Sequence, residues 1–561
     1  MTRGVHPVWE EAYPQGLAWD FTVPDKPLTS LLREAAKRHP ARIAIDFLGA
    51  RMTYRQLADD VSKLAAGLQG MGVKKGDRVA LCLPNCPAYV MGYYAILTLG
   101  AVVVNCNPLM TRDELESQVL DSGAAVMLSV NLAKIFPKVA PLAQPGGPLR
   151  ALVVADFAAM LPPMARWGMR LLKRRDLAPV TYGGGVMGLK PLVTHRRHLR
   201  LTTVSPGDLA LLQYTGGTTG VPKAACLTHR NLLANTLQIK AWLGRVHGDC
   251  AVLGVLPLFH VFAMTTCMNL PLAIGGTMVL LPLFNMKMFR KTLRRTHPYI
   301  VPGVPSLFGA MVNTALLKPR DVAGIKWCIS GGAPLPAEIR ARFMAMTGCV
   351  LMEGYGLTEA SPVVACNSRD GNVDGSVGLP LPGTEVEIRH IHNHGKVMKP
   401  GARGEVWVRG PQVMRGYWNR AAETAQVLKN GWLRTGDVGT MDKRGYVFLT
   451  DRIKDIIISH GYNVYPRVIE EAMHRHEAVA EVTAIAIPHP HKGQVAKIFV
   501  ALKHGYHTTA GELMAFAHEH LNAIECPAEV EIRASLPKTL TGKLSKKELV
   551  AEEQLKREKM L

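Results

Sequence analysis

The chain has 561 residues, 48% of them hydrophobic, which is too long for one ordinary domain, so we expect at least two. Its 66 basic and 44 acidic residues give a net charge of +22, which suits an anionic ligand, a nucleic acid or an acidic membrane surface without choosing among them. Ten scattered cysteines, with no C-x-x-C pair and no histidine at metal-ligand spacing, argue against a disulfide framework or a zinc site and favour a reduced cytoplasmic protein.

The N-terminus carries acidic and proline residues where an export signal needs an apolar run. Two long segments, residues 79–110 and 250–284, contain no Asp, Glu, Lys or Arg. Prolines and glycines interrupt both, so each is predicted to form a strand, a short helix and a strand in a protein core rather than one membrane-spanning helix of about 20 residues.

The first 150 residues alternate between helical and strand patterns. Helices are expected at residues 28–38 and 54–71, and strands at residues 78–83 and 101–104. This alternation predicts an α/β layered domain.

A basic, amphipathic stretch follows at residues 157–175, FAAMLPPMARWGMRLLKRR. On a helix, one side carries apolar residues and the other basic ones: Met164, Trp167, Leu171 and Leu172 against Arg166, Arg170, Lys173 and Arg174. Such a pattern is typical of a helix at a membrane interface. A surface helix that packs on its own domain and exposes its basic side to solvent explains the pattern equally well.

Residues 214–223, YTGGTTGVPK, hold three glycines, three threonines and a lysine. Glycines allow backbone amides to converge on an anion, and the threonine hydroxyls and Lys223 add donors and positive charge. The flanking segments 208–213 and 224–228 are predicted strands. The spacing excludes the phosphate loop G-x-x-x-x-G-K-[ST], since Ala224 follows the lysine, but an ordinary Gly/Thr-rich hairpin remains an alternative.

Four segments follow with fewer chemical signals. Thr228 is expected to cap a helix over residues 231–243. The stretch PLFHVFA places His260 among apolar residues, where a core histidine is the default interpretation, and residues 301–308 are apolar and loop-rich. The segment WCISGGAPLP, residues 327–336, ends a predicted strand in a glycine pair that can admit a flat ring.

Two further loops combine groups suited to a nucleotide. MEGYGLTE, residues 352–359, offers a tyrosine face for stacking on a base and a carboxylate for a hard cation. In WLRTGD and GYVFLTDRIK, Asp437 can accept ribose hydroxyls and Arg452 can reach phosphate. Each loop taken alone is more typical of a solvated turn.

The composition changes near residue 455, where a segment of roughly 100 residues with its own strand and helix signals predicts a small α+β domain. It ends in PKTLTGKLSKKELV, in which Lys543 follows Gly542 in a loop before a basic helix.

In this order, YTGGTTGVPK, SGGAPLP, YGLTE, TGD, DRIKDIIISHGYNVYP and PKTLTGKL resemble the adenylate-forming superfamily of acyl-CoA synthetases, luciferases and peptide-synthetase adenylation domains. The similarity spans nearly the whole chain, and QYTGGTTGVPK, PLFHVFA and GYNVYP most resemble bacterial long-chain fatty acid-CoA ligases. The resemblance implies an α/β fold, with a large N-terminal domain at residues 1–450 and a small α+β lid at residues 451–561 that swings about Lys454.

The resemblance also implies two half-reactions and assigns residues to them. A carboxylate attacks the α-phosphate of ATP and expels pyrophosphate, and the CoA thiol then displaces AMP. Lys543 would bridge the carboxylate and the α-phosphate, and Thr218 with Glu359 would hold Mg²⁺. The residues implied to bind ATP are Thr215, Gly216, Gly217, Thr218, Thr219, Gly220, Lys223, Gly332, Ala333, Tyr355, Gly356, Thr358, Asp437 and Arg452.

The acyl chain is expected near His260, Val304 and Phe308, and CoA near His460 and Gly461. Two residues depart from the family pattern: Ala224 stands where glycine usually follows the lysine, and His460 stands where a small residue is common beside the CoA path.

The leading hypothesis is a fatty acyl-CoA ligase for long or medium chains. The alternatives are a ligase for aryl or other carboxylates, an enzyme that loads a carrier protein, and, from a different class, a non-catalytic membrane-bound lipid and nucleotide sensor. The expected partners are a fatty acid, ATP, CoA and an anionic membrane on its cytoplasmic face, with no nucleic acid. The sequence leaves the oligomeric state open, a homodimer included.

Overall fold

The computed structural model describes residues 7–194, 198–215, 222–246, 249–460, 462–489, 491–538 and 544–558. The chain divides into two compact units. Unit 1 comprises Met1–Asn372, Pro380–Glu385 and Arg409–Gly431, and unit 2 comprises Val373–Leu379, Val386–Val408 and Trp432–Leu561. The predicted boundary between residues 450 and 451 remains a prediction, because the units describe compactness and divide the chain differently.

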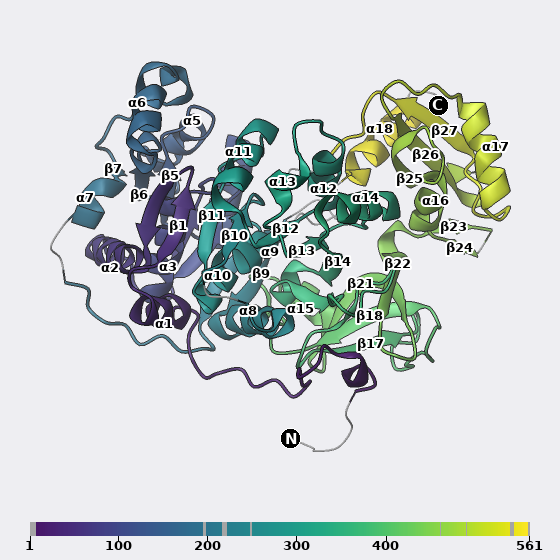
Figure 1. Cartoon of the computed structure of the whole chain (residues 1–561), viewed down its shortest axis with the longest axis horizontal. Helices are drawn as coiled ribbons and strands as arrows, with labels where there is room; N and C mark the ends of the chain where they lie inside the picture. Colours follow the sequence, from purple (N-terminus) through teal and green to yellow (C-terminus); the bar gives the residue numbers. More distant parts are fainter. Residues whose placement is uncertain are drawn as a thin grey trace. The chain divides into compact units, whose positions relative to one another are not determined.

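Unit 1 contains two sheets with helices packed around them (Figure 1). Within this unit, the first sheet runs in the order β15-β14-β13-β12-β10-β11-β1-β2. The second sheet runs β19-β9-β8-β4-β3-β5-β6-β7. The strands of the first sheet are β1 Ile43–Phe47, β2 Ala50–Thr53, β10 Ala251–Gly254, β11 Thr277–Leu280, β12 Ile300–Gly303, β13 Trp327–Gly331, β14 Leu351–Gly356 and β15 Val363–Cys366. The strands of the second are β3 Arg78–Leu81, β4 Val102–Asn105, β5 Val126–Val130, β6 Ala151–Ala155, β7 Val186–Gly188, β8 Leu209–Thr215, β9 Lys223–Thr228 and β19 Gly416–Tyr417.

The helices of unit 1 include the two predicted near the N-terminus and the one capped by Thr228. The hydroxyl of Thr228 accepts a hydrogen bond from the Asn231 amide at 3.1 Å, which confirms the predicted cap. The helices are α1 Ser30–Arg38, α2 Tyr54–Gly70, α3 Pro87–Thr98, α4 Arg112–Ser122, α5 Phe136–Val139, α6 Pro163–Leu171, α7 Leu189–Thr194, α8 His229–Leu243, α9 Val261–Ala263, α10 Leu270–Ile274, α11 Met286–Thr296, α12 Pro305–Val312, α13 Pro319–Val322, α14 Ala337–Thr347 and α15 Ala421–Val427.

The two uncharged segments form core structure, as predicted. Residues 79–110 give β3, α3 and β4, and every residue of α3 from Pro87 to Leu97 is buried. Residues 250–284 give β10, a run of short helical segments and β11. Within the described part of the chain, none of the helices is both long and apolar enough to cross a membrane.

Two expectations were wrong in detail. Residues 301–308 are not loop-rich: they complete β12 and begin α12, where Pro305 occupies the first helical position that proline fits best. The stretch at residues 157–175 is not one helix, because Pro162 and Pro163 delay its start; α6 covers Pro163–Leu171, between short 3₁₀ turns at Ala158–Met160 and Arg174–Asp176.

Unit 2 contains two smaller sheets. In the first, β17 Glu385–Arg389, β18 Gly404–Arg409 and β21 Trp432–Met441 are neighbours, and β22 Val447–Arg452 pairs with β21. The second runs β24-β23-β26-β25, with β27 paired to β26. Its strands are β23 Ile457–Ser459, β24 Tyr462–Val464, β25 Val479–His489, β26 Gly493–Leu502 and β27 Glu529–Arg533, and the helices are α16 Pro466–Met473, α17 Ala510–His520 and α18 Lys546–Glu558.

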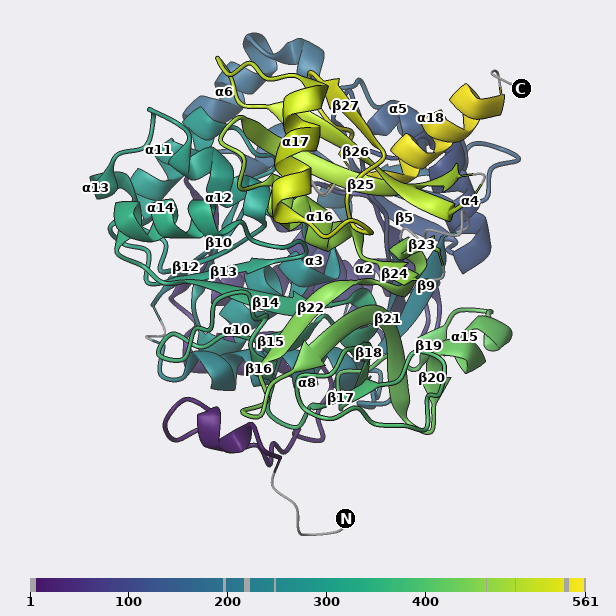
Figure 2. The same ribbon diagram turned by 90° about the vertical axis from the view of Figure 1, so that its right-hand side faces the viewer.

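Helices cover both faces of this second sheet (Figure 2). Ile469 of α16 and Leu513 of α17 join one buried cluster with alternate residues of β25 and β26. Leu549 of α18 joins a separate cluster with the intervening residues, such as Ile485 and Phe499. The alternation of side chains along the strands therefore produces the small α+β domain that the sequence predicts.

Candidate functional site

The carboxyl ends of four parallel strands bring predicted site residues to one edge of the first sheet. β10, β12, β13 and β14 are parallel neighbours, with Val301 opposite Cys328 and Gly331 opposite Gly354 in their register. Val304 follows β12, Gly332 and Ala333 follow β13, Tyr355 and Gly356 end β14, and Thr358 and Glu359 lie in the 3₁₀ turn just beyond. Ligands of α/β proteins typically bind at this edge of a sheet.

The glycine pair at the end of β13 permits a close approach by an aromatic ring of the chain itself. A Cβ atom on Gly331 would lie 3.2 Å from the Phe262 ring, and Gly332 has φ +85°, which glycine adopts without strain. The Glu353 carboxylate accepts a hydrogen bond from the Leu335 amide at 3.2 Å and so ties this loop to β14.

His260 is the N-cap of α9, at the same edge. Its Nδ1 accepts a hydrogen bond from the Phe262 amide at 3.4 Å. The preceding loop is fixed by a buried polar network that sequence reasoning missed. Gln213 of β8 donates to the Phe259 carbonyl at 3.0 Å, and Asn85 both donates to the Leu256 carbonyl and accepts from the Leu258 amide.

Phe308 lies deeper than the other residues predicted for the acyl chain. Its ring is fully buried and packs edge-on against Phe343, with centroids 5.1 Å apart. Val304, just before α12, is partly exposed.

Lys223 and Glu359, which come from two different motifs, meet on one tyrosine. The Tyr417 hydroxyl donates a hydrogen bond to Oε1 of Glu359 at 2.7 Å, and the Lys223 ammonium lies 5.9 Å from the centroid of the Tyr417 ring. Burial, followed by the negative charge of Glu359, raises the pKa of Tyr417, so the phenol stays a donor.

Backbone pairing positions Tyr417. β19 runs antiparallel to β9, with Tyr417 opposite Ala225, and the Met414 amide donates to the Glu359 carbonyl at 2.7 Å. Sequence reasoning missed Tyr417, because a single aromatic after a glycine gives no local signal of a carboxylate about 60 residues away. Its contacts link Lys223, at the start of β9, to Glu359 of the YGLTE segment.

The two predicted strands that flank the glycine-rich segment are present and pair antiparallel. Thr215 lies opposite Lys223, and the Thr215 hydroxyl donates to the Lys223 carbonyl at 3.2 Å. The loop residues Gly216, Gly217, Thr218, Thr219 and Gly220 lie outside the described residues, as do Gly461 and Lys543.

Asp437 and Arg452 form an ion pair in unit 2. They lie opposite each other on β21 and β22, and Nε of Arg452 is 3.1 Å from Oδ1 of Asp437. Asp437 is buried, and its amide donates to the Thr435 hydroxyl at 3.0 Å, whereas Arg452 is half exposed. The pair has the donors and acceptors expected for a ribose and a phosphate.

Charged groups gather around the predicted hinge residue Lys454, which lies in a 3₁₀ turn after β22. Lys546, the first residue of α18, forms an ion pair with Glu470 at 2.9 Å. Burial alone would lower the pKa of Lys546, but the carboxylates of Glu470, Asp451 and Asp455 raise it overall. The start of α18, a few residues after Lys543, is therefore tied to Glu470 of α16.

His460 occupies the turn between β23 and β24 with φ +50°. Histidine is one of the few residues enriched in this left-handed region, so the turn accommodates it. Its amide donates to the Lys492 carbonyl at 2.9 Å, and the residue itself is exposed.

Of the two residues predicted to hold Mg²⁺, the structure describes Glu359 and not Thr218. Within the described ranges, no group of three or more His, Cys, Asp or Glu side chains could hold a metal ion. Mg²⁺ however needs few protein ligands and takes most of its coordination from water and phosphates. Tyr417 binds one carboxylate oxygen of Glu359 and orients the partly exposed group, which suits a single carboxylate ligand.

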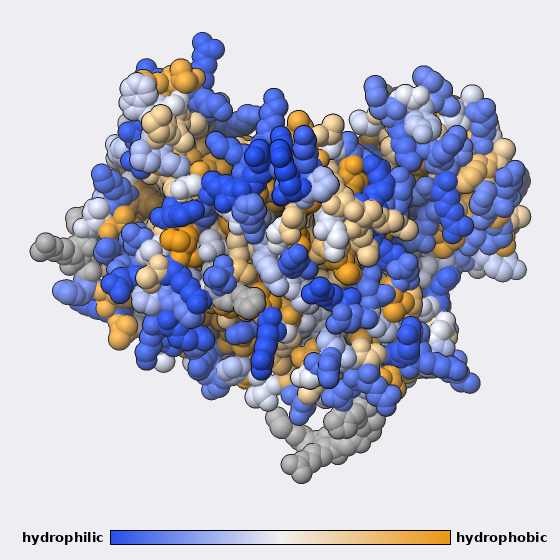
Figure 3. Space-filling model, viewed as in Figure 1, coloured by the Kyte–Doolittle hydropathy of each residue, from blue (hydrophilic) through white to orange (hydrophobic). Residues whose placement is uncertain are grey.

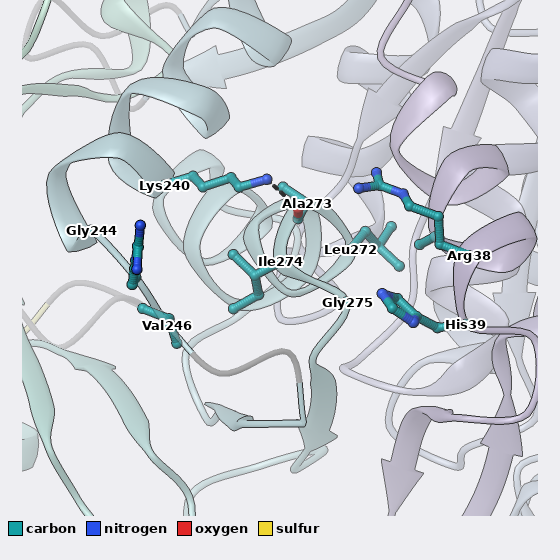
Figure 4. Close-up of a pocket in the computed structure, with 11 residues that line it drawn as sticks. Arg38, His39, Lys240, Gly244, Val246, Leu272, Ala273, Ile274 and Gly275 are labelled. Atoms are coloured by element: carbon teal, nitrogen blue, oxygen red, sulfur yellow. Dashed lines mark hydrogen bonds between the residues drawn. The ribbon is translucent and has the colours of Figure 1, made fainter.

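A surface pocket of about 600 Å³ lies elsewhere in unit 1, where α1, α8 and α10 end (Figure 4). Lys240, one of the cations that line it, donates to the Ala273 carbonyl near the end of α10 at 2.9 Å. None of the predicted site residues lines it.

Comparisons with known proteins show which family the chain belongs to. The AMP-binding enzyme family matches residues 32–418, and the AMP-binding enzyme C-terminal domain matches residues 468–543. A long-chain-fatty-acid–CoA ligase of Bacillus subtilis (strain 168) is 40% identical over 554 residues, covering 97% of this chain and 98% of the relative. A feruloyl-CoA synthase of Amycolatopsis sp. is 33% identical over 516 residues, covering 92% and 96%.

The structure of the anthranilate CoA ligase AuaEII in complex with anthranoyl-AMP superposes with a TM-score of 0.84 over 96% of this chain and 99% of that one, at 23% identity. This structural similarity confirms the predicted α/β fold with a large N-terminal and a small C-terminal domain. The chain belongs to the AMP-binding enzyme family, within the adenylate-forming superfamily.

Proposed function

We propose that this protein ligates a long- or medium-chain fatty acid to CoA through an acyl-adenylate, releasing pyrophosphate and then AMP. The observation that carries the proposal is the 40% identity to a long-chain-fatty-acid–CoA ligase along essentially the whole of both chains. The meeting of Lys223 and Glu359 on Tyr417 agrees with it, because it joins two of the predicted ATP-binding loops.

In the first half-reaction, a carboxylate and a triphosphate must approach within bonding distance, so their repulsion has to be offset. Lys543 supplies a cation between them, and Lys223 with the amides of residues 215–220 holds the departing phosphates. Glu359 and Thr218 would hold Mg²⁺, which would supply further neutralisation of phosphate charge. Asp437 accepts the ribose hydroxyls, and Arg452, already paired with Asp437, contacts ribose and phosphate.

In the second half-reaction, the CoA thiol attacks the acyl-adenylate and AMP departs. We place the lid at residues 451–561, with Lys454 as the hinge, so that its rotation withdraws Lys543 and presents His460 and Gly461 to CoA. The enzyme acts in the cytoplasm, in peripheral contact with an anionic membrane surface.

A ligase for aryl acids is the second candidate, because the feruloyl-CoA synthase is 33% identical over nearly the same length. The test is pyrophosphate release with a panel of fatty and aromatic acids, with and without CoA. Turnover with fatty acids alone supports the proposal, turnover with aromatic acids alone supports the second candidate, and nucleotide binding without turnover indicates a sensor. A requirement for acyl carrier protein in place of CoA identifies a loading enzyme.

A further inference from the structure

The amphipathic helix α6 exposes its apolar side rather than packing it. Not one residue of α6 is buried. Met164 and Leu172 are each 88% exposed, Trp167 is 72% exposed and Leu171 is 57% exposed. A surface helix that packs on its own domain would bury this side, so that explanation of the pattern is wrong.

The segment that carries α6 is anchored at both ends. Phe157 is buried, and its ring packs edge-on against Phe47 with centroids 5.8 Å apart. Asn131 joins the two ends: its side chain accepts from the Phe157 amide at 2.8 Å, and its carbonyl accepts from the Ala178 amide at 2.9 Å. In both ribbon views α6 lies at the outer edge of unit 1 (Figures 1 and 2).

The cations of this segment divide into two groups. Arg166 and Arg170 support the base of the segment, through a hydrogen bond to the Ala159 carbonyl at 2.9 Å and an ion pair with Asp156 at 2.7 Å. Lys173, Arg174 and Arg175 are exposed, and none of them forms an ion pair with a described residue. Residues 157–175 contain five basic and no acidic side chains, and the acids that flank them in the sequence are Asp156 and Asp176.

We propose that this surface, named here the α6 face and made of Met164, Trp167, Leu171, Leu172, Lys173, Arg174 and Arg175, docks the protein on an anionic phospholipid bilayer. This combination of exposed apolar and basic side chains complements a lipid surface. The apolar side chains would contact the acyl chains, and the cations would contact the phosphate headgroups. In the space-filling view, hydrophobic side chains gather among hydrophilic ones at the end of the molecule where α6 lies (Figure 3).

Charge argues against a second copy of the chain as the occupant. In a two-fold dimer through the α6 face, the unpaired cations of one protomer would face those of the other, which is unfavourable. An interfacial helix also suits the proposed function, on which this part of the inference rests, because a long-chain fatty acid partitions into the bilayer and can be collected there.

Co-sedimentation with vesicles tests the inference, using the full chain and two vesicle types: phosphatidylcholine alone, and phosphatidylcholine with an equal amount of phosphatidylglycerol. One variant removes apolar groups (Trp167→Ser with Leu171→Ser) and another reverses charge (Lys173→Glu with Arg174→Glu). The matched control, Leu120→Ser with Leu201→Ser, removes apolar side chains that are 64% and 93% exposed elsewhere. Activity on octanoate without vesicles shows whether each variant is folded and active.

The wild type and the control should bind the anionic vesicles, and less as salt rises, because screening acts over about 10 Å at 0.1 M. Both α6 variants should bind about tenfold or more weakly. The charge reversal removes two cations, each of which contributes on the order of a fivefold affinity, and the serine variant removes apolar area that would be buried in the bilayer. Turnover of octanoate by both variants should be unchanged. Equal binding by wild type and α6 variants, binding to neither vesicle, or a wild-type dimer that the apolar variant makes monomeric would each overturn the inference. If the wild type did not turn over octanoate, that result would instead count against the proposed function.

Discussion

Replacing Tyr417 with phenylalanine removes one hydroxyl and keeps the ring. The lost contact is the 2.7 Å hydrogen bond to Glu359, between partly buried groups. A hydrogen bond to a charged group contributes about 1.5–3 kcal/mol, which corresponds to roughly 10- to 150-fold in an equilibrium constant. Because Tyr417 acts through the proposed Mg²⁺ ligand, this loss should be seen mainly as weaker Mg²⁺ affinity, which falls about 10- to 100-fold when the support of a ligand is removed.

The assay is fatty acid-dependent ATP–pyrophosphate exchange at varied free Mg²⁺. Tyr417→Phe should need at least about tenfold more Mg²⁺ for half-maximal exchange, and saturating Mg²⁺ should restore most of the rate. The ring that lies against Lys223 is retained, so the KM for MgATP at saturating Mg²⁺ should change little. Tyr182→Phe, at an exposed tyrosine, is the control. An unchanged Mg²⁺ requirement with a lower melting temperature would refute the reasoning and leave Tyr417 a packing residue.

Four further outcomes are expected. Lys543→Ala should slow adenylate formation about a thousandfold or more, equivalent to about 4 kcal/mol, yet spare thioester formation from supplied acyl-adenylate; equal loss in both would make the lysine structural. Lys454→Pro should do the reverse and let acyl-adenylate accumulate, because a fixed φ hinders the hinge; unchanged thioester formation would exclude the hinge. Gly356→Ala should prevent stable folding, since its Cβ would overlap the Pro362 carbonyl, and a normal melting temperature would contradict this. Burial lowers the pKa of His229 to about 4, below its ordinary 6.5, so protonation of this histidine favours the unfolded chain. The free energy of unfolding should therefore fall by about 3 kcal/mol as the pH drops from about 6.5 to 4. A His229→Gln variant whose stability has the same pH dependence as the wild type would contradict the assignment.

Local pattern predicted the elements that hold the glycine-rich loop. Apolar runs on either side of YTGGTTGVPK became β8 and β9, and Thr228 caps α8 as its position before the helix indicated. These features depend on residues close in sequence, where propensity and capping act directly.

Long-range contacts could not be predicted in this way. Tyr417 reaches Glu359 only because β19 pairs with β9, and Gln213 fixes the loop before His260 from a different sheet. One amino-acid sequence does not indicate which distant residues pair, since each residue taken alone is compatible with many environments. The exposure of the apolar side of α6 was likewise undecidable, because periodicity gives the direction of a side chain and not what covers it.

Pyrophosphate exchange in the absence of CoA tests adenylate formation on a fatty acid most directly. With labelled pyrophosphate, ATP and a series of saturated fatty acids and aryl acids, the label should enter ATP only when a fatty acid is present, and the acyl-adenylate should be recovered by mass spectrometry. Exchange with aryl acids but not fatty acids would contradict the proposed substrate. The absence of exchange with every acid, from protein that binds ATP, would contradict adenylate formation itself.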